Sequence, residues 1–171
     1  KLLGVKIKKK NKTFIINGVG INGFKFKKKL LLNAGNSGTL ARLIISILVK
    51  SPYKVKLIGD HSLSKRDFGR IIDPLTKFGL EFYPKNKTRL PLFFKRIKEN
   101  KSHKFSEKKG SAQVKSAIML ASLNFKSVTK IIAKKSRNHT ENFFKFLKIP
   151  IKIKSTSKRD YITIKGINSI N

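Results

Sequence analysis

The 171-residue sequence predicts an α/β fold that is built inside out, with buried helices and with sheets on the exterior. Segments 36–50 and 111–123 are helical, and apolar residues surround most of their circumference, which is typical of buried helices. Strand-like segments such as 53–57 and 161–165 alternate apolar residues with polar ones, usually lysine. Such alternation indicates sheets with one face in water.

The order of the predicted elements also repeats along the chain, because two successive sets read β-α-β-α-β-β. The first set lies, in chain order, at 30–33, 38–50, 53–58, 66–78, 80–83 and 90–95. The second set lies at 103–106, 111–123, 127–132, 139–147, 149–154 and 160–165. A repeat of this size indicates stacked units of one design. We therefore expect the closing strands of a truncated first unit within 1–29, a second unit at 30–98 and a third at 99–171.

The composition limits the possible functions. The net charge of +33 would fit a nucleic-acid footprint. However, the basic residues are mostly lysines spread in short runs among Ile, Asn and Phe, as AT-rich coding bias would also produce, which favours a solvated lysine-rich exterior. The absence of cysteine excludes disulfides, Cys-ligated zinc and thiol catalysis. The sequence shows no membrane-length apolar run and no signal peptide, so we expect a cytoplasmic protein.

A turn of small and polar residues precedes each buried helix, at 35–39 and at 110–113. Free backbone N–H groups and the positive end of the helix dipole make such turns anion sites. Gly38 would let a ligand approach the backbone closely. Plain N-capping, for example by Ser37 or Ser111, would explain either turn alone. Two such turns at equivalent positions of a repeat favour a binding site.

Arg66 and Arg137 occupy matching places in the two sets, each between a strand and the following helix. The planar guanidinium suits phosphate and carboxylate, whereas this chain uses lysine for general charge. The alternative is a surface arginine paired with Asp67 or Glu141, which would contribute little. The matching positions favour a functional role.

Other patterns in the sequence do not indicate a functional site. The segment 18–23 fits G-x-G-x-x-G, but no helix opens there, so we interpret it as a glycine-rich connection. The three histidines lack metal-ligand spacing, and the eight acidic residues form no evident carboxylate pair. The sequence therefore predicts anion binding without a visible general base and without a metal site.

Four segments, 32–44, 59–75, 110–123 and 136–141, closely resemble successive signature segments of the EPSP synthases (3-phosphoshikimate 1-carboxyvinyltransferases), in the same order and spacing. The resemblance implies two domains, each of three β-α-β-α-β-β units with buried helices. It implies that 1–171 is most of an N-terminal domain, truncated at both ends, which agrees with a start at Lys1 rather than at methionine.

The resemblance also implies residue roles. The residues matching the phosphoenolpyruvate side are Asn36, Gly38, Thr39 and Arg66. Those matching the shikimate 3-phosphate side are Ser111, Ala112, Gln113 and Arg137, with Gln113 also near phosphoenolpyruvate. Arg42 matches a position that shapes the site, and Asp67 and Asn138 depart from the family's usual Pro and Asp. No catalytic residue is implied within this chain.

The implied reaction transfers the enolpyruvyl group of phosphoenolpyruvate to shikimate 3-phosphate, in aromatic amino acid biosynthesis. No metal or organic cofactor, nucleic acid or membrane is implied, and we expect a monomer at full length and no turnover by the fragment alone. Gly38 matches the position where a larger residue hinders glyphosate, so we expect sensitivity to that inhibitor. The alternatives are a UDP-N-acetylglucosamine enolpyruvyl transferase, which usually carries a Cys-bearing loop, and a nucleic-acid-binding protein, whose DNA affinity would fall steeply with salt.

Overall fold

The computed structural model describes residues 1–97 and 103–167, so the boundary expected between the second and third units, at 98/99, lies outside the described residues. The strands are β1 (Lys6–Lys10), β2 (Thr13–Asn17), β3 (Leu30–Asn33), β4 (Val55–Ile58), β5 (Leu80–Tyr83), β6 (Leu92–Arg96), β7 (His103–Glu107), β8 (Val128–Lys134), β9 (Ile151–Ser155) and β10 (Arg159–Lys165). The helices are α1 (Gly38–Ile47), α2 (His61–Ser64), α3 (Gly69–Lys77), α4 (Ala112–Ser122) and α5 (His139–Phe146).

Two four-stranded sheets share one topology, which confirms the repeat. Their strand orders are β3-β4-β6-β5 and β7-β8-β10-β9. In each sheet the first two strands are parallel, and both remaining pairs are antiparallel. The carboxyl ends of β3 and β7 consequently stand at equivalent places, and each leads into the turn before a central helix.

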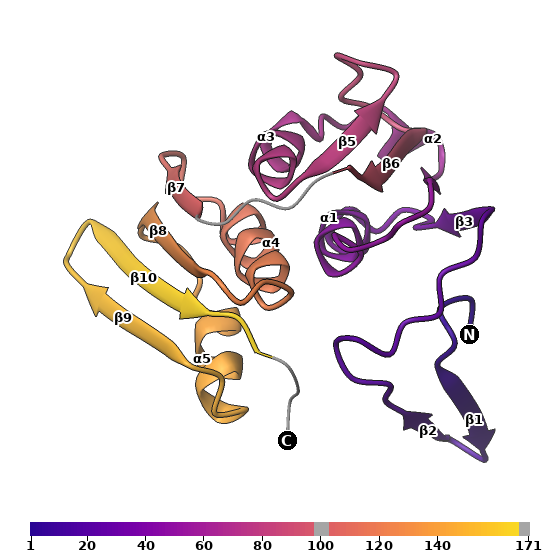
Figure 1. Cartoon of the computed structure of the whole chain (residues 1–171), viewed down its shortest axis with the longest axis horizontal. Helices are drawn as coiled ribbons and strands as arrows, with labels where there is room; N and C mark the ends of the chain where they lie inside the picture. Colours follow the sequence, from indigo (N-terminus) through magenta and orange to yellow (C-terminus); the bar gives the residue numbers. More distant parts are fainter. Residues whose placement is uncertain (98–102, 168–171) are drawn as a thin grey trace.

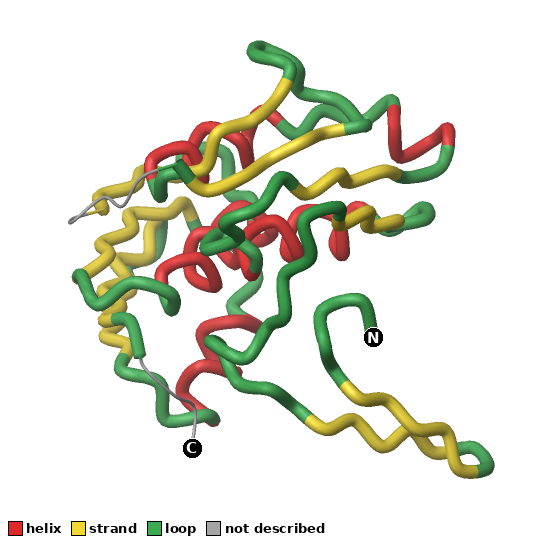
Figure 2. The backbone as a smooth tube through the Cα atoms, turned by 45° about the vertical axis from the view of Figure 1, so that its right-hand side comes forward, coloured by secondary structure: helices red, strands yellow, loops and turns green. Residues whose placement is uncertain are grey.

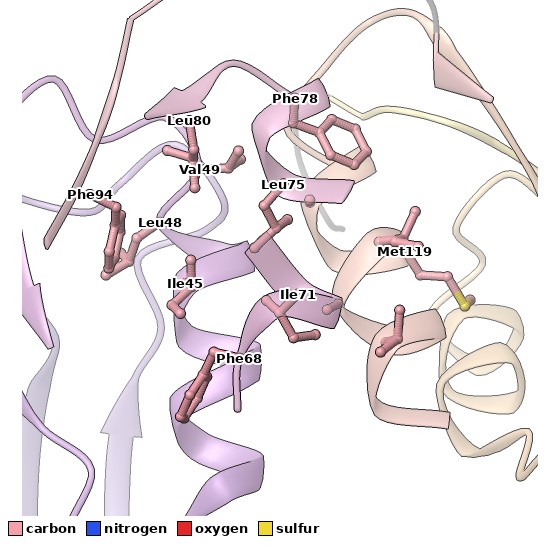
Figure 3. Packing of buried hydrophobic residues seen from close by; sticks show 14 of the residues in the cluster. Ile45, Leu48, Val49, Phe68, Ile71, Leu75, Phe78, Leu80, Phe94 and Met119 are labelled. Atoms are coloured by element: carbon pink, nitrogen blue, oxygen red, sulfur yellow. The ribbon is translucent and has the colours of Figure 1, made fainter. Parts of the chain in front are cut away.

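The helices α1 and α4 lie side by side between the two sheets, with α3 beside them (Figure 1). Ile45, Ile71 and Met119 come from these three helices and meet in the core, which Figure 3 shows. Burying an aliphatic or aromatic side chain of this size stabilises the fold by about 1.5–3 kcal/mol. Along β8 the residues alternate between exposed and buried, so the sheet keeps one wet face as predicted. The inside-out fold class is confirmed.

Phe78 joins the two repeats. Its ring lies at the end of α3, with its centroid 5.0 Å from that of Phe105 on β7 and 5.3 Å from that of Phe125 after α4. The His103 ring is closer still, at 4.2 Å. The two sheets therefore share a single hydrophobic core rather than two separate ones.

The structure differs from the prediction between 59 and 78, where it forms two helices in place of one. The side chain of Asp60 accepts a hydrogen bond from the Leu63 N–H at 2.7 Å and begins the short α2. The Asp67 side chain, one position before the N-cap residue Phe68, then accepts a hydrogen bond at 2.8 Å from the N–H of Gly69, the first residue of α3. Asp67 thus supports a helix start at the position where the family usually has proline.

The predicted burial of α1 on nearly all sides is wrong for its first turn. Ala41 and Ile45 are fully buried, whereas 48% of Leu40 is exposed. Leu43 and Ile44 on the same helix are only partly buried, so α1 is less covered than the all-round apolar pattern suggested. By contrast α4, which lies between α1 and β8, is mostly buried.

The hairpin of β1 and β2 extends away from the two sheets (Figures 1 and 2). Phe14 and Ile16 on β2 are 61% and 62% exposed. The segment 18–23 that follows forms no helix, which confirms its interpretation as a glycine-rich connection.

Candidate anion-binding site at the starts of two helices

The turn before α1 is held by Ser37. Its Oγ accepts a hydrogen bond from the Leu40 N–H at 3.1 Å, which makes Ser37 the N-cap. Asn36 is thereby left out of the capping, and its Oδ1 instead accepts a hydrogen bond from Nη2 of Arg66 at 3.4 Å. N-capping therefore explains one residue of the turn and leaves its neighbour directed at an arginine.

Gly38, Arg42 and Arg66 form what we call the arginine corner. Arg42 donates from Nη1 to the Gly38 carbonyl at 3.1 Å and lies over the Phe68 ring, 4.9 Å from its centroid. A Cβ at Gly38 would stand 2.7 Å from Nη1 of Arg42 and 3.0 Å from Nη1 of Arg66. The missing side chain of Gly38 therefore lets both guanidinium groups lie against the first turn of α1.

The arginine corner is strongly electropositive. Partial burial, followed by the charges of Arg66 and Arg70, lowers the pKa of Arg42. The neighbouring Asp67 offsets part of this charge, and its own pKa is lowered first by the hydrogen bond from the Gly69 N–H. Guanidinium groups that repel one another at the start of a helix are stabilised by a bound anion.

The turn before α4 is held in two ways. The Oγ of Ser111 accepts from the Val114 N–H at 3.4 Å and caps the helix. The buried carboxylate of Glu107 accepts from the Gly110 N–H at 2.7 Å and pairs with Arg70 at 3.3 Å. Because Arg70 belongs to α3, the turn of one repeat is fixed by a side chain of the other.

A hydrogen bond joins the two turns. Gln113 donates from Nε2 to Oγ1 of Thr39 at 2.8 Å. These residues occupy equivalent places in the two repeats, so the predicted equivalence of the turns becomes direct contact.

Next to this bond lies a hollow of about 220 Å³, which we call the α4 pocket. It is lined by Thr39, Leu43, Ala112, Gln113, Ser116, Arg137, His139 and Thr140. The structure thus gathers Thr39, Ala112, Gln113 and Arg137 around one space and places Asn36, Gly38 and Arg66 at the arginine corner beside it. Ser111 is near the pocket as the helix cap.

The alternative to a functional role for Arg137 is a surface ion pair with Glu141. Glu141 instead pairs with the buried Lys115, whose Nζ lies 2.5 Å from Oε1 of Glu141. No acidic residue lines the α4 pocket.

Among residues 1–97 and 103–167, no three His, Asp or Glu side chains are grouped as metal ligands would be. Nor does any helix within those ranges have the length and apolar character needed to cross a membrane.

Comparison with known proteins decides the family. The EPSP synthase (3-phosphoshikimate 1-carboxyvinyltransferase) family profile matches residues 1–170. The chain belongs to the EPSP synthase family.

Individual relatives agree with this EPSP synthase assignment. The chain is 38% identical over 152 residues to a 3-phosphoshikimate 1-carboxyvinyltransferase of Paracoccus denitrificans, covering 88% of this chain and 34% of the relative. It is 41% identical over 143 residues to that of Streptococcus pyogenes serotype M2, covering 81% and 33%. A solved EPSP synthase of Acinetobacter baumannii superposes with a TM-score of 0.82 at 31% identity, covering 98% of this chain and 37% of that one. The chain thus spans about a third of the length of these EPSP synthases.

Four pocket residues of this EPSP synthase family member were not predicted: Leu43, Ser116, His139 and Thr140. Two signals could have found the polar ones. Ser116 lies one helical turn after Gln113, on the same side of α4. His139 and Thr140 follow Arg137 after a single intervening residue, Asn138, and belong to the first turn of α5.

Proposed function

We propose that a protein carrying this chain transfers the enolpyruvyl group of phosphoenolpyruvate to shikimate 3-phosphate, giving EPSP and phosphate, and that this chain binds the two anions. The hydrogen bond between Gln113 and Thr39 carries the proposal. It joins the arginine corner and the α4 pocket into one surface on which two anionic ligands can lie next to each other. The family membership supports the same reaction.

The arginine corner fits phosphoenolpyruvate. Two guanidinium groups and the start of α1 surround the place where Gly38 leaves space, and Arg66 also contacts Asn36. Phosphate and carboxylate are the groups that such forked donors bind best. We assign Asn36, Gly38, Thr39 and Arg66 to phosphoenolpyruvate.

The α4 pocket fits shikimate 3-phosphate. Arg137 supplies a charge for the phosphate, and Gln113, Ser116 and Thr140 supply polar groups suited to sugar hydroxyls. We assign Ser111, Ala112, Gln113 and Arg137 to this substrate. Gln113 stands between the two subsites.

In the proposed reaction the phosphoenolpyruvate methylene takes a proton, the sugar hydroxyl adds, and phosphate is then eliminated. Neutralising two polyanions side by side lowers the repulsion that opposes their approach. No acid lines the α4 pocket, so we assign no proton transfer to the described residues and expect the 171-residue chain alone to show no turnover. A cytoplasmic location, a monomeric state, glyphosate sensitivity and the lack of a cofactor stay predictions.

The test compares two neighbouring residues in a full-length protein that carries this sequence. Arg66→Lys removes the forked guanidinium group that donates a hydrogen bond to Asn36. Lys65→Arg changes the exposed residue next to Arg66 in the sequence. We expect Arg66→Lys to raise KM for phosphoenolpyruvate by roughly tenfold or more, and Lys65→Arg to change it by less than about twofold.

Phosphate release from phosphoenolpyruvate is measured with shikimate 3-phosphate and, separately, with UDP-N-acetylglucosamine. Equal effects of the two substitutions would remove Arg66 from the site. Turnover with the nucleotide sugar alone would overturn the proposed acceptor.

A further inference from the structure

A buried group of charges lies behind the α4 pocket. Lys115 on α4 is fully buried, and its Nζ lies 2.5 Å from Oε1 of Glu141 and 3.5 Å from Oδ2 of Asp160. Asp160 also accepts hydrogen bonds from Lys135 at 2.8 Å and from Ser155 at 2.7 Å. We call these five residues the Lys115 cluster. It ties α4 to α5, to the neighbouring strands β9 and β10 and to the residue following β8.

Stability alone is a poor explanation for this cluster. A buried ion pair costs desolvation energy, and apolar residues of similar volume often stabilise a protein equally well or better. The other buried residues of α4 are mostly apolar, so an apolar residue would suit position 115. What an ion pair adds is a specific partner, because a buried lysine must stay beside a carboxylate, whereas an apolar side chain can contact any apolar neighbour.

The element whose position the ion pair would fix is the start of α5. Its N-cap residue, Asn138, makes no side-chain cap hydrogen bond. Two tertiary contacts hold the first turn instead. Glu141 pairs with Lys115, and Thr140 shares a hydrogen bond of 2.6 Å with Ser116. Two consecutive residues of α4 thus hold two consecutive residues of α5.

This contact borders the α4 pocket. Ser116, His139 and Thr140 line it from the two helices, and Arg137 lines it from the segment that leads into α5. A shift of the α5 start would therefore move Arg137 relative to Gln113. A displacement of about 1 Å is enough to weaken binding to a preorganised site substantially.

We propose that Lys115 is a positioning residue for the acceptor substrate. Through Glu141 it holds one wall of the α4 pocket in place relative to Gln113. That wall is formed by Arg137, His139 and Thr140. The proposal rests on the proposed function, in which this pocket takes a phosphorylated cyclic polyol, shikimate 3-phosphate. Lys115 itself does not line the pocket.

The main test is a double substitution in the 171-residue chain. Lys115→Met with Glu141→Leu removes the pair together and leaves Asp160 paired with Lys135. We expect the circular dichroism spectrum and the midpoint of thermal unfolding to stay close to wild type. The Kd for shikimate 3-phosphate should rise by roughly tenfold or more, as loss of a charged contact allows. Lys130→Met, on the exposed side of β8, is the matched control and should leave the Kd unchanged.

A second variant covers the case in which the double variant does not fold. Glu141→Ala removes the link to α5, while Lys115 keeps Asp160 as a partner. It should also raise the Kd, whereas Glu141→Gln, which keeps an oxygen acceptor of the same size beside the Lys115 ammonium, should stay within about threefold of wild type. Wild-type affinity in a folded double variant or in folded Glu141→Ala would overturn the proposal, as would a failure of both to fold, which would make the cluster a stability element. Absence of binding by the wild-type chain would instead count against the proposed function.

Discussion

Gly38 shows how one missing side chain can shape the proposed anion site. The two guanidinium groups of Arg42 and Arg66 occupy the volume that a Cβ at this position would need. The role of the glycine is therefore steric, since no positive φ is involved. Ser37 next to it performs the ordinary task of capping the helix.

We expect Gly38→Ala to move the two guanidinium groups without unfolding the chain, because the atoms it meets are the far ends of flexible side chains. KM for phosphoenolpyruvate in the full-length protein should rise by about tenfold, while the Kd for shikimate 3-phosphate should change by less than about twofold. Gly18→Ala is the control, because a Cβ there would meet nothing within 4 Å. An unchanged KM in Gly38→Ala would show that the arginine corner does not hold this substrate.

At the scale of single elements, the sequence could predict the described strands and the long helices. Alternating apolar and polar residues indicate a strand with one buried face, and a long segment that is apolar nearly all round indicates a buried helix. The short helix α2 was missed, because a single helix was predicted at 66–78. Asp60 is a typical N-cap residue and could have indicated the start of α2. The Lys115 cluster could not be predicted in the same way. In a chain with 41 basic residues, a lysine is expected to be exposed to solvent. Only the contacts with Glu141 and Asp160, which are distant in the sequence, make a buried Lys115 possible.

Asp160 should make the packing of α4 against the sheet sensitive to acid. Burial by itself raises the pKa of Asp160, but hydrogen bonds from Lys135 and Ser155 and the charges of Lys115 and Lys135 outweigh it, so the net pKa is lowered from 3.8. The unfolded chain therefore binds this proton more readily than the folded one. The stabilisation is complete above the ordinary pKa and is lost as pH falls through the lowered folded value.

Thermal unfolding of wild type and Asp160→Asn, measured from about pH 6 to about pH 2.5, tests this linkage. At the upper end Asp160→Asn should be less stable by about 2–4 kcal/mol, and the difference should shrink toward the acid end. Asp73→Asn, an exposed position on α3, should show no such change. A difference that is constant with pH would contradict a charged Asp160 in the folded chain.

At the scale of the whole molecule, the two repeats form a site that neither forms alone. Arg70 on α3 fixes the turn before α4, Gln113 on α4 binds Thr39 on α1, and Phe78 closes the core between the two repeats. The predicted repeat of polar turns was confirmed, and their direct contact follows from the packing of α1 on α4. The high net charge surrounds this site with a field that attracts anions, so ligand binding should weaken with salt.

The most direct measurement of the central claim is a titration of the 171-residue chain with shikimate 3-phosphate, followed by amide shifts in nuclear magnetic resonance. We expect saturable binding, with the largest shifts at Gln113 and in the segment from Arg137 to Thr140. Arg137→Ala should raise the Kd by roughly tenfold, whereas Arg159→Ala, an exposed arginine on β10, should not. No saturable binding, or equal Kd values for wild type and Arg137→Ala, would contradict the claim that the start of α4 holds this substrate.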